Sequence, residues 1–151
     1  MIRPTGAQIA AARATHRMPV AGAHTVGAAD GGPGLPGTGW SREYGDLRVP
    51  HFLGLHAVQI LPLIAVLLRR MKSAVRRQRA VMVAAASYAS LFGILLWQAL
   101  SGQSVLAPHG PTLAAIAAWL AGMLAGVAWV RLSGGNGADV PSTSMNVAVP
   151  R

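Results

Sequence analysis

The chain has 151 residues, of which 52% are hydrophobic and only 11% charged, and its formal net charge is +9. Soluble domains carry about 25% charged residues, so the composition argues against a water-soluble domain. The chain has no cysteine, which excludes disulfides, thiolate metal sites and cysteine nucleophiles. The basic charge comes without a recognised nucleic-acid-binding motif, so no nucleic acid partner is predicted.

Residues 1–49 contain no apolar run long enough to cross a membrane and are predicted to be a Gly/Pro-rich extramembrane segment. Residues 7–15 favour a short Ala-rich helix, and residues 30–34 (DGGPG) favour consecutive turns. Arg13 and Arg17 interrupt the start, so it has no apolar core of a signal peptide. A transit peptide is the alternative, although the start is nearly free of serine.

Charged residues of both signs alternate just before the first apolar run, as Arg42 beside Glu43 and Asp46 close to Arg48. One interpretation is a solvated segment with weak ion pairs, each worth about 0–1 kcal/mol. The other is a site on the outer face of the membrane, with Asp46 and His51 near the mouth of the helix. The sequence leaves both open.

Three apolar runs follow, at about residues 50–68, 80–100 and 111–130. Each has about 20 residues, enough for a helix to cross the ~30 Å hydrocarbon core. The prediction is an all-α integral membrane bundle of three transmembrane helices. Pro62 removes one helical hydrogen bond and should kink the first of them. The Gly- and Ser-containing tail, residues 132–151, is predicted to be disordered.

The loops predict an orientation. The segment 69–79 holds six of the thirteen basic residues, whereas the loop 101–110 has no formal charge. Basic loops stay in the cytoplasm, and Arg131 after the third run agrees with this. The N-terminus is therefore expected outside and the C-terminus inside, in the inner (plasma) membrane of a bacterium.

His56 and Gln59 lie three residues apart in the first apolar run, so they share one face of a helix. Ionisable residues within a membrane are functional candidates by default. The structural alternative is a neutral histidine that holds helices together through a hydrogen bond.

The histidines are also candidate ligands for haem or a metal ion. His51 and His56 are five residues apart, about 140° around a helix, so they do not converge on one ion. The second and third apolar runs contain no histidine, whereas haem between helices usually takes one from each side. His109 could join His51 near the outer surface, and a partner chain could supply a ligand. No metal or cofactor is predicted, with haem or quinone at His51, His56, Gln59 and His109 as the alternative.

Two ridges of small residues at four-residue spacing predict close helix packing, within the chain or with another chain. They are Ala85, Ala89 and Gly93 in the second run and Ala114, Ala118, Gly122 and Gly126 in the third.

No catalytic signature occurs, whether a nucleophile elbow, a phosphate-binding loop or an HExxH motif. No catalytic residue is therefore predicted. We expect a non-enzymatic helical bundle that assembles with partners, other membrane helices or copies of itself. The alternative is a subunit of a membrane redox, proton-handling or transport system that uses His56 and Gln59.

The pattern HTVG–DGGPGLP–GWS–GDLR–PHF-GLHA-Q-LP spans about 40 residues. Its parts are His24 onward, 30–36, 39–41, 45–48 and 50–62. In this pattern the chain resembles a family of uncharacterised bacterial multi-pass membrane proteins, and the later helices are compatible with it. The resemblance implies no activity. Such proteins carry further spans upstream, so we expect this chain to be a shortened member or to have a misplaced start. An in-frame apolar run encoded upstream would support that expectation.

Overall fold

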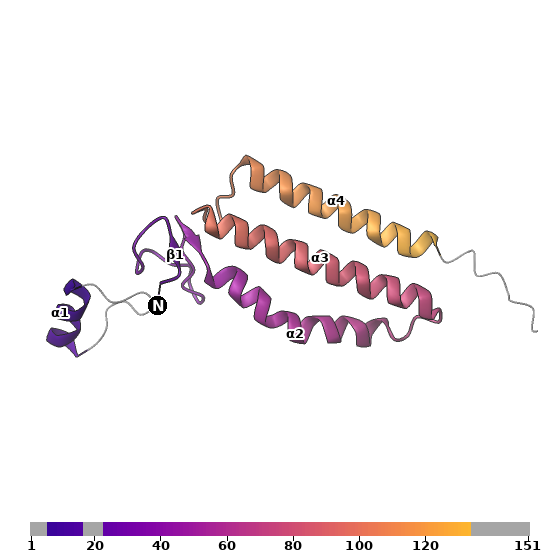
Figure 1. Cartoon of the computed structure of the whole chain (residues 1–151), viewed down its shortest axis with the longest axis horizontal. Helices are drawn as coiled ribbons and strands as arrows, with labels where there is room; N and C mark the ends of the chain where they lie inside the picture. The colour runs from indigo at the N-terminus through magenta and orange to yellow at the C-terminus, as the bar shows by residue number, and fades with distance from the viewer. Residues whose placement is uncertain (1–5, 17–22, 134–151) are drawn as a thin grey trace, which may run out of the picture.

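The structure is a computed structural model that describes residues 6–16 and 23–133. A short helix, α1 (Gly6–Thr15), comes first. Three long helices follow, α2 (Arg48–Leu68), α3 (Ala74–Leu100) and α4 (Gly110–Leu132), and each is long and apolar enough to cross a membrane (Figure 1). The expected all-α architecture is confirmed. Most of the predicted disordered tail, residues 134–151, lies outside the described residues.

The three long helices lie in a row, with α3 in the middle (Figure 1). α3 packs against α2 on one side and α4 on the other, whereas α2 and α4 make no comparable contact with each other. A closed bundle would bury one side of every helix. A row instead leaves both broad faces open. In the most apolar 18-residue stretch of α2, and in that of α3, no residue is buried.

The helices extend beyond the apolar runs. α3 begins at Ala74, within the basic segment, because the Ser73 side chain accepts a hydrogen bond from the Arg76 N–H and caps the helix. α2 continues through Pro62, and Figure 1 shows it changing direction along its course. This agrees with the removal of a helical hydrogen bond at an internal proline.

A small folded unit, which we call the cap (residues 23–47), precedes α2. Its strands β1 (Thr25–Val26) and β2 (Gly45–Asp46) pair antiparallel, with Thr25 opposite Asp46. The connection between them folds back on itself through a bridge between Gly34 and Ser41. Gly31 and Gly37 adopt positive φ, as turns of this kind require.

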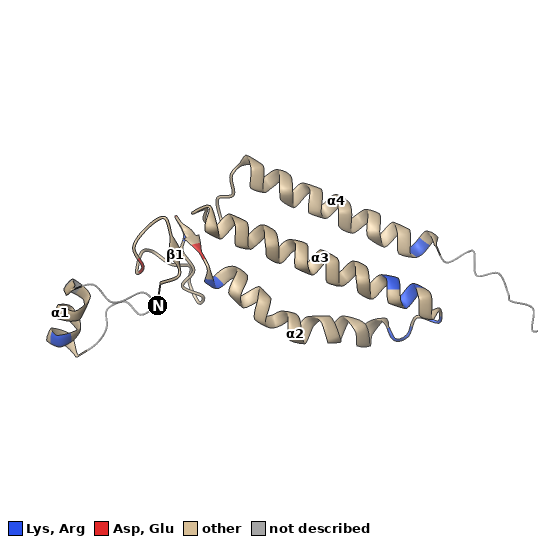
Figure 2. Ribbon diagram, viewed as in Figure 1, with Lys and Arg blue, Asp and Glu red and all other residues tan. Residues whose placement is uncertain are grey.

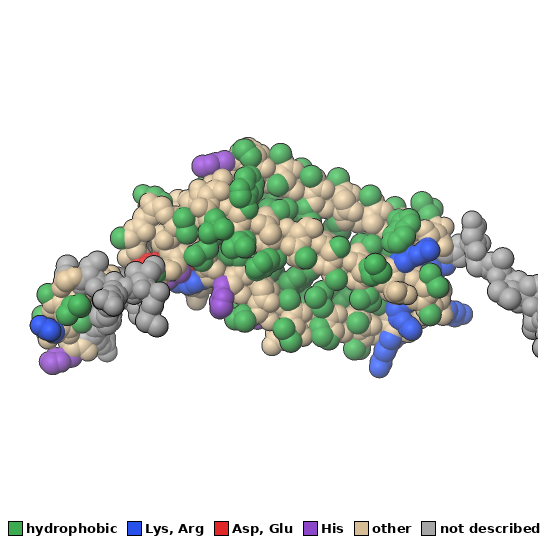
Figure 3. Space-filling view, in the orientation of Figure 1, with side chains coloured by type: hydrophobic (Ala, Val, Ile, Leu, Met, Phe, Trp, Pro, Cys, Tyr) green, Lys and Arg blue, Asp and Glu red, His purple; other side chains and the backbone are tan. Residues whose placement is uncertain are grey.

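The buried side chains gather where the cap meets the ends of the helices. Among the described residues outside this region, only Val130 is also buried. The buried set at the cap end is Gly45, Asp46, Val49, Pro50, Gln98, Ala99, Gln103, Ser104 and Thr112. The protein thus has a compact interior at one end and, along the helices, an apolar surface (Figure 3).

Charge separates along the same axis. The basic residues of the α2–α3 connection, the start of α3 and the end of α4 gather at the end opposite the cap (Figure 2). From residue 47 to residue 133 the chain has no Asp or Glu. The basic end therefore has no carboxylate side chain of its own within the described residues.

Candidate functional site

Asp46 is the centre of the cap. It is 4% exposed. Its carboxylate accepts hydrogen bonds from the backbone N–H of Ser41 at 2.8 Å and of Arg48 at 2.9 Å. The Arg48 guanidinium adds a further pair, from Nε at 3.0 Å and from Nη2 at 2.6 Å, and Nη2 also donates to the Gly39 carbonyl. One carboxylate therefore joins the connection between β1 and β2 to the first turn of α2.

This geometry changes the electrostatics of Asp46. Burial alone would raise the pKa of its carboxyl group, but the hydrogen bonds from Arg48 and Ser41 outweigh burial and hold the pKa below its ordinary value. The contact is not the solvated ion pair that one interpretation of the sequence described. Nor does the structure join Asp46 to His51, because the partners of the carboxylate are Ser41 and Arg48.

Asp30 holds the start of β1 through its carboxylate. Its Oδ1 accepts from the backbone N–H groups of His24 at 3.1 Å and Thr25 at 2.8 Å, and the His24 ring lies 3.5 Å away. Burial opposes ionisation, but these hydrogen bonds lower the pKa of Asp30 overall. The two aspartates hold β1 and β2 in register without a large apolar core.

Four buried polar side chains close the connection between α3 and α4. Gln98 donates to the carbonyl of Ser104 at 2.8 Å, and Gln103 accepts from the Thr112 hydroxyl at 2.8 Å. Gln103 also accepts from the backbone N–H of His109, and the Ser104 hydroxyl reaches the Ser41 carbonyl in the cap. Polar residues on both sides of a short loop were the sequence signal for this network, which our sequence predictions did not include.

Two aromatic side chains tie the long helices together. The Tyr88 hydroxyl donates to the Leu53 carbonyl of α2 at 2.5 Å. Trp119 Nε1 donates to both the carbonyl and the hydroxyl of Ser87, which joins α4 to α3. A polar hydrogen in an apolar run must find an acceptor, so such residues mark helix contacts. The sequence does not say which acceptor each one finds.

His56 lies on α2 at the end of an aromatic series. The Trp40 and Phe52 rings meet edge-on at 6.0 Å, and the Phe52 and His56 rings lie 4.0 Å apart. His56 Nδ1 is 2.8 Å from the Phe52 carbonyl oxygen. Since a carbonyl only accepts, Nδ1 is the donor of this hydrogen bond, and in the neutral form of the ring Nε2 is then an acceptor.

Gln59 is exposed on the same helix, one turn further along. Within residues 6–16 and 23–133, its carboxamide makes no hydrogen bond. In the row of helices, the α2 residues that approach α3 include Gly54, which faces the Phe92 ring, and Leu53, which accepts from Tyr88. The Gln59 carboxamide is therefore exposed and does not join α2 to α3 through a hydrogen bond in the described part of the chain.

His51 and His109 are exposed and lie apart. His51 is in the first turn of α2, and His109 precedes α4, on the opposite side of α3. The described residues contain no group of three or more His, Asp or Glu side chains placed to hold a metal ion. The structure thus does not bring His51, His56 and His109 together around one ligand.

In the two small-residue ridges, some positions contact a neighbouring helix and others do not. A Cβ built on Gly126 would lie 2.7 Å from Val83 Cγ1, so this glycine permits α3 and α4 to approach. Gly93 and Gly122 have open space instead. Ala89, Ala114 and Ala118 are exposed, and Ala85 is half-buried.

Comparison with protein-family profiles, with curated proteins and with solved structures found no match to this chain. The family resemblance seen in the sequence therefore stays a prediction.

Proposed function

We propose that this chain is a non-enzymatic integral membrane protein whose three apolar helices assemble with other membrane helices, from copies of itself or from partner proteins. The observation that carries the proposal is the exposure of Gln59. Its carboxamide lies on the surface of an apolar helix and has no hydrogen-bond partner among the described residues.

The position of Gln59 gives this observation its weight. α2 runs from Arg48 to Leu68, so its midpoint is near residue 58, next to Gln59. In a membrane-spanning α2, the carboxamide would lie near the middle of the hydrocarbon. An unsatisfied polar group there costs several kcal/mol, and a helix from another chain can satisfy it. Exposed apolar neighbours, Leu55 and Val58, would complete the contact surface.

We further propose that the basic end lies in the cytoplasm of a bacterium, in its inner membrane, with the cap outside. The charge asymmetry supports this orientation, because basic loops are retained on the cytoplasmic side. The bacterial assignment rests on the resemblance of residues 24–62.

Assembly is tested by comparing three forms of the chain in mild detergent. Gln59→Leu should weaken assembly roughly 3- to 20-fold, the worth of about 0.6–1.7 kcal/mol for an interhelical hydrogen bond. Gln78→Leu is the matched control, since Gln78 is exposed at the basic start of α3. Sedimentation of the purified chain alone measures self-assembly. Co-purification measures the binding of partner proteins. Equal assembly of the wild type and Gln59→Leu in both assays refutes the proposal.

A second function has one observation in its favour. The hydrogen bond from His56 Nδ1 to Phe52 fixes the tautomer that leaves Nε2 as acceptor, the arrangement in which histidine ligates metals or haem. A redox, proton-handling or transport subunit would use this nitrogen together with Gln59 and a ligand from another chain.

Two substitutions separate the two functions. If His56 only packs, His56→Gln should be tolerated, because glutamine offers both a donor and an acceptor, and His56→Leu should cost about 0.6–2 kcal/mol. We expect this result. If His56 binds a cofactor or relays protons, both variants should lose a Soret band, a bound quinone or the phenotype, because glutamine neither titrates nor binds haem iron well. Amounts of inserted protein are compared first.

A further inference from the structure

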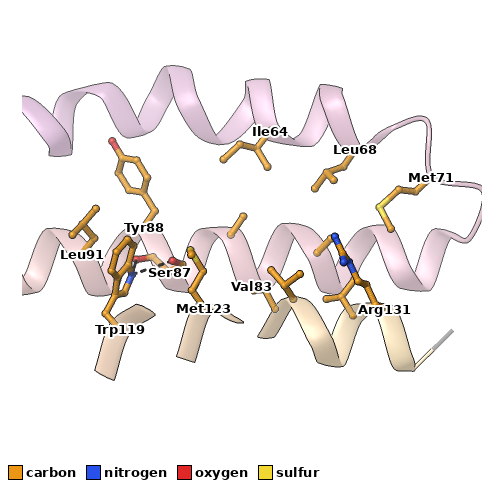
Figure 4. Close-up of a pocket in the computed structure, with 14 residues that line it drawn as sticks. Ile64, Leu68, Met71, Val83, Ser87, Tyr88, Leu91, Trp119, Met123 and Arg131 are labelled. Atoms are coloured by element: carbon orange, nitrogen blue, oxygen red, sulfur yellow. Dashed lines mark hydrogen bonds between the residues drawn. The ribbon is translucent and has the colours of Figure 1, made fainter. Parts of the chain in front are cut away.

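An apolar groove runs along α3 between α2 and α4 (Figure 4). Its volume is about 490 Å³, within the range of ligand pockets, roughly 300–1,000 Å³. Ile64 and Leu68 line it from α2, Val83 from α3 and Met123 from α4. The groove exists because the helices form a row and because α2 changes direction, so its second half does not close over α3.

The two aromatic donors within the groove are already satisfied. Tyr88 donates to the Leu53 carbonyl, and Trp119 donates to Ser87. This part of the groove therefore offers neither its phenol nor its indole hydrogen to an occupant. An apolar chain, which asks for no hydrogen bond, fits it better than a polar ligand does.

The end of the groove is different. Arg131 lines it there together with Met71 (Figure 4). Arg131 makes no ion pair or hydrogen bond with the described residues. Arg79 of α3 lies close to the end of α4, where it stacks on Trp129 at 5.0 Å and donates to the Ser133 carbonyl. The mouth of the groove is cationic, and no carboxylate from residues 47–133 balances it.

The length of the groove matches one leaflet of a bilayer. It follows α3 from Ala80 to Leu91, a rise of roughly 16 Å at ~1.5 Å per residue. Half of the ~30 Å hydrocarbon core is about 15 Å. With the helices across a membrane, the cationic mouth would lie at the level of the headgroups, and the apolar part would reach to about the middle of the membrane.

We propose that this groove is a binding site for an anionic phospholipid, with an acyl chain along α3 and the phosphate headgroup at Arg131. Cationic pockets between helices at the basic side of a membrane protein suit such headgroups. The site uses residues other than Gln59, so it stands independently of the proposed assembly.

Trp119 provides the probe, because it lies beside Ser87 in the apolar part of the groove. A chain with Trp40→Phe, Trp97→Phe and Trp129→Phe keeps only this tryptophan. It is reconstituted in phosphatidylcholine vesicles that contain a minor fraction of brominated phosphatidylglycerol or of brominated phosphatidylcholine. Bromine on the acyl chain quenches nearby tryptophan. We expect the anionic lipid to associate roughly fivefold more strongly than the zwitterionic one.

Variants show whether Arg131 causes this preference. Arg131→Gln should abolish it, and Arg131→Lys should keep it. Arg77→Gln, an equal loss of charge at an exposed residue away from the groove, should leave it nearly unchanged. Ala84→Leu, which fills the groove, should reduce quenching by the anionic lipid.

Three results would overturn the site. The first is equal quenching by both lipids in the parent chain. The second is an equal effect of Arg77→Gln and Arg131→Gln, which would indicate a diffuse basic surface. The third is an absence of quenching by either lipid, which would mean that a protein helix occupies the groove. Helix content by circular dichroism must match across the variants.

Discussion

At the scale of a single residue, Asp46 is both ionised and buried. It must be ionised to hold the Arg48 guanidinium and the two backbone N–H groups, yet it is buried where the cap meets the helices. Its neighbour Gly45 explains the burial. A Cβ at Gly45 would overlap the carbonyl oxygen of Ala99, so only glycine lets β2 lie against the end of α3.

The charge of Asp46 predicts how the cap responds to pH. Its folded pKa lies below the ordinary value of 3.8, so the ionised carboxylate contributes stability that is complete above about pH 5. This contribution falls as the pH drops through the folded pKa. The protection factors of the Ser41 and Arg48 amides in detergent, which are corrected for the pH dependence of intrinsic exchange, should therefore be high at neutral pH and fall below about pH 4.

Asp46→Asn should loosen the same amides at neutral pH, by about 1–3 kcal/mol, the cost of leaving buried hydrogen-bonding groups without their partner. Glu43→Gln is the control, since Glu43 is an exposed carboxylate of the cap. Protection that stays constant from neutral pH to pH 3, or an Asn variant as protected as the wild type, would contradict this role.

At the scale of the elements, α3 organises the molecule. It contacts α2 and α4, and it meets β2 through Ala99 and Gly45. The helix contacts depend on small residues and on aromatic donors. Gly54 admits the Phe92 ring, and Gly126 admits Val83.

Two glycines of one ridge should behave differently. Gly126→Leu should weaken the contact between α3 and α4, because the new side chain would collide with Val83. Gly122→Leu should be tolerated within a single chain, since open space surrounds that position. The measurement is cross-linking between cysteines placed on α3 and α4. If Gly122→Leu instead disrupts detergent-resistant assembly, its ridge faces another chain; equal cross-linking in the Gly126→Leu variant and the parent would refute the contact.

The sequence predicted the helices well because their signal is local. A run of apolar residues of bilayer length needs no knowledge of its neighbours. The start of α3 at Ala74 was missed, because capping by Ser73 carries a helix into a basic segment that apolarity does not mark. The row arrangement and the groove were missed as well. They depend on which small residues meet across helices, and an Ala- and Gly-rich sequence offers many equivalent choices.

The cap also has features that the sequence could predict and others that it could not. Its turns at glycine and proline could be predicted, since backbone preference decides them. The burial of Asp46 could not, because it depends on Gly45 meeting Ala99, far away in the sequence. Likewise, His56 and Gln59 were identified as polar groups in an apolar run. Only the structure separates them, one with its Nδ1 bonded to the chain and the other without a partner among the described residues.

At the scale of the whole molecule, the chain has two unlike ends joined by an apolar middle. One end is the cap with its buried polar contacts, and the other carries the cations of residues 69–79 and Arg131 (Figure 2). An apolar surface of this extent is stable against lipid rather than water. This surface therefore requires a bilayer to lie between the two ends.

Cysteine labelling in intact cells tests this requirement directly, since the chain has no cysteine of its own. Ser101→Cys and Ser73→Cys are matched substitutions at exposed serines, one at the cap end and one at the basic end. An impermeant thiol reagent should label the Ser101→Cys variant in intact cells and the Ser73→Cys variant only after the cells are opened. Labelling of the Ser73→Cys variant alone would invert the orientation, and labelling of both in intact cells would contradict the placement of a membrane between the two ends.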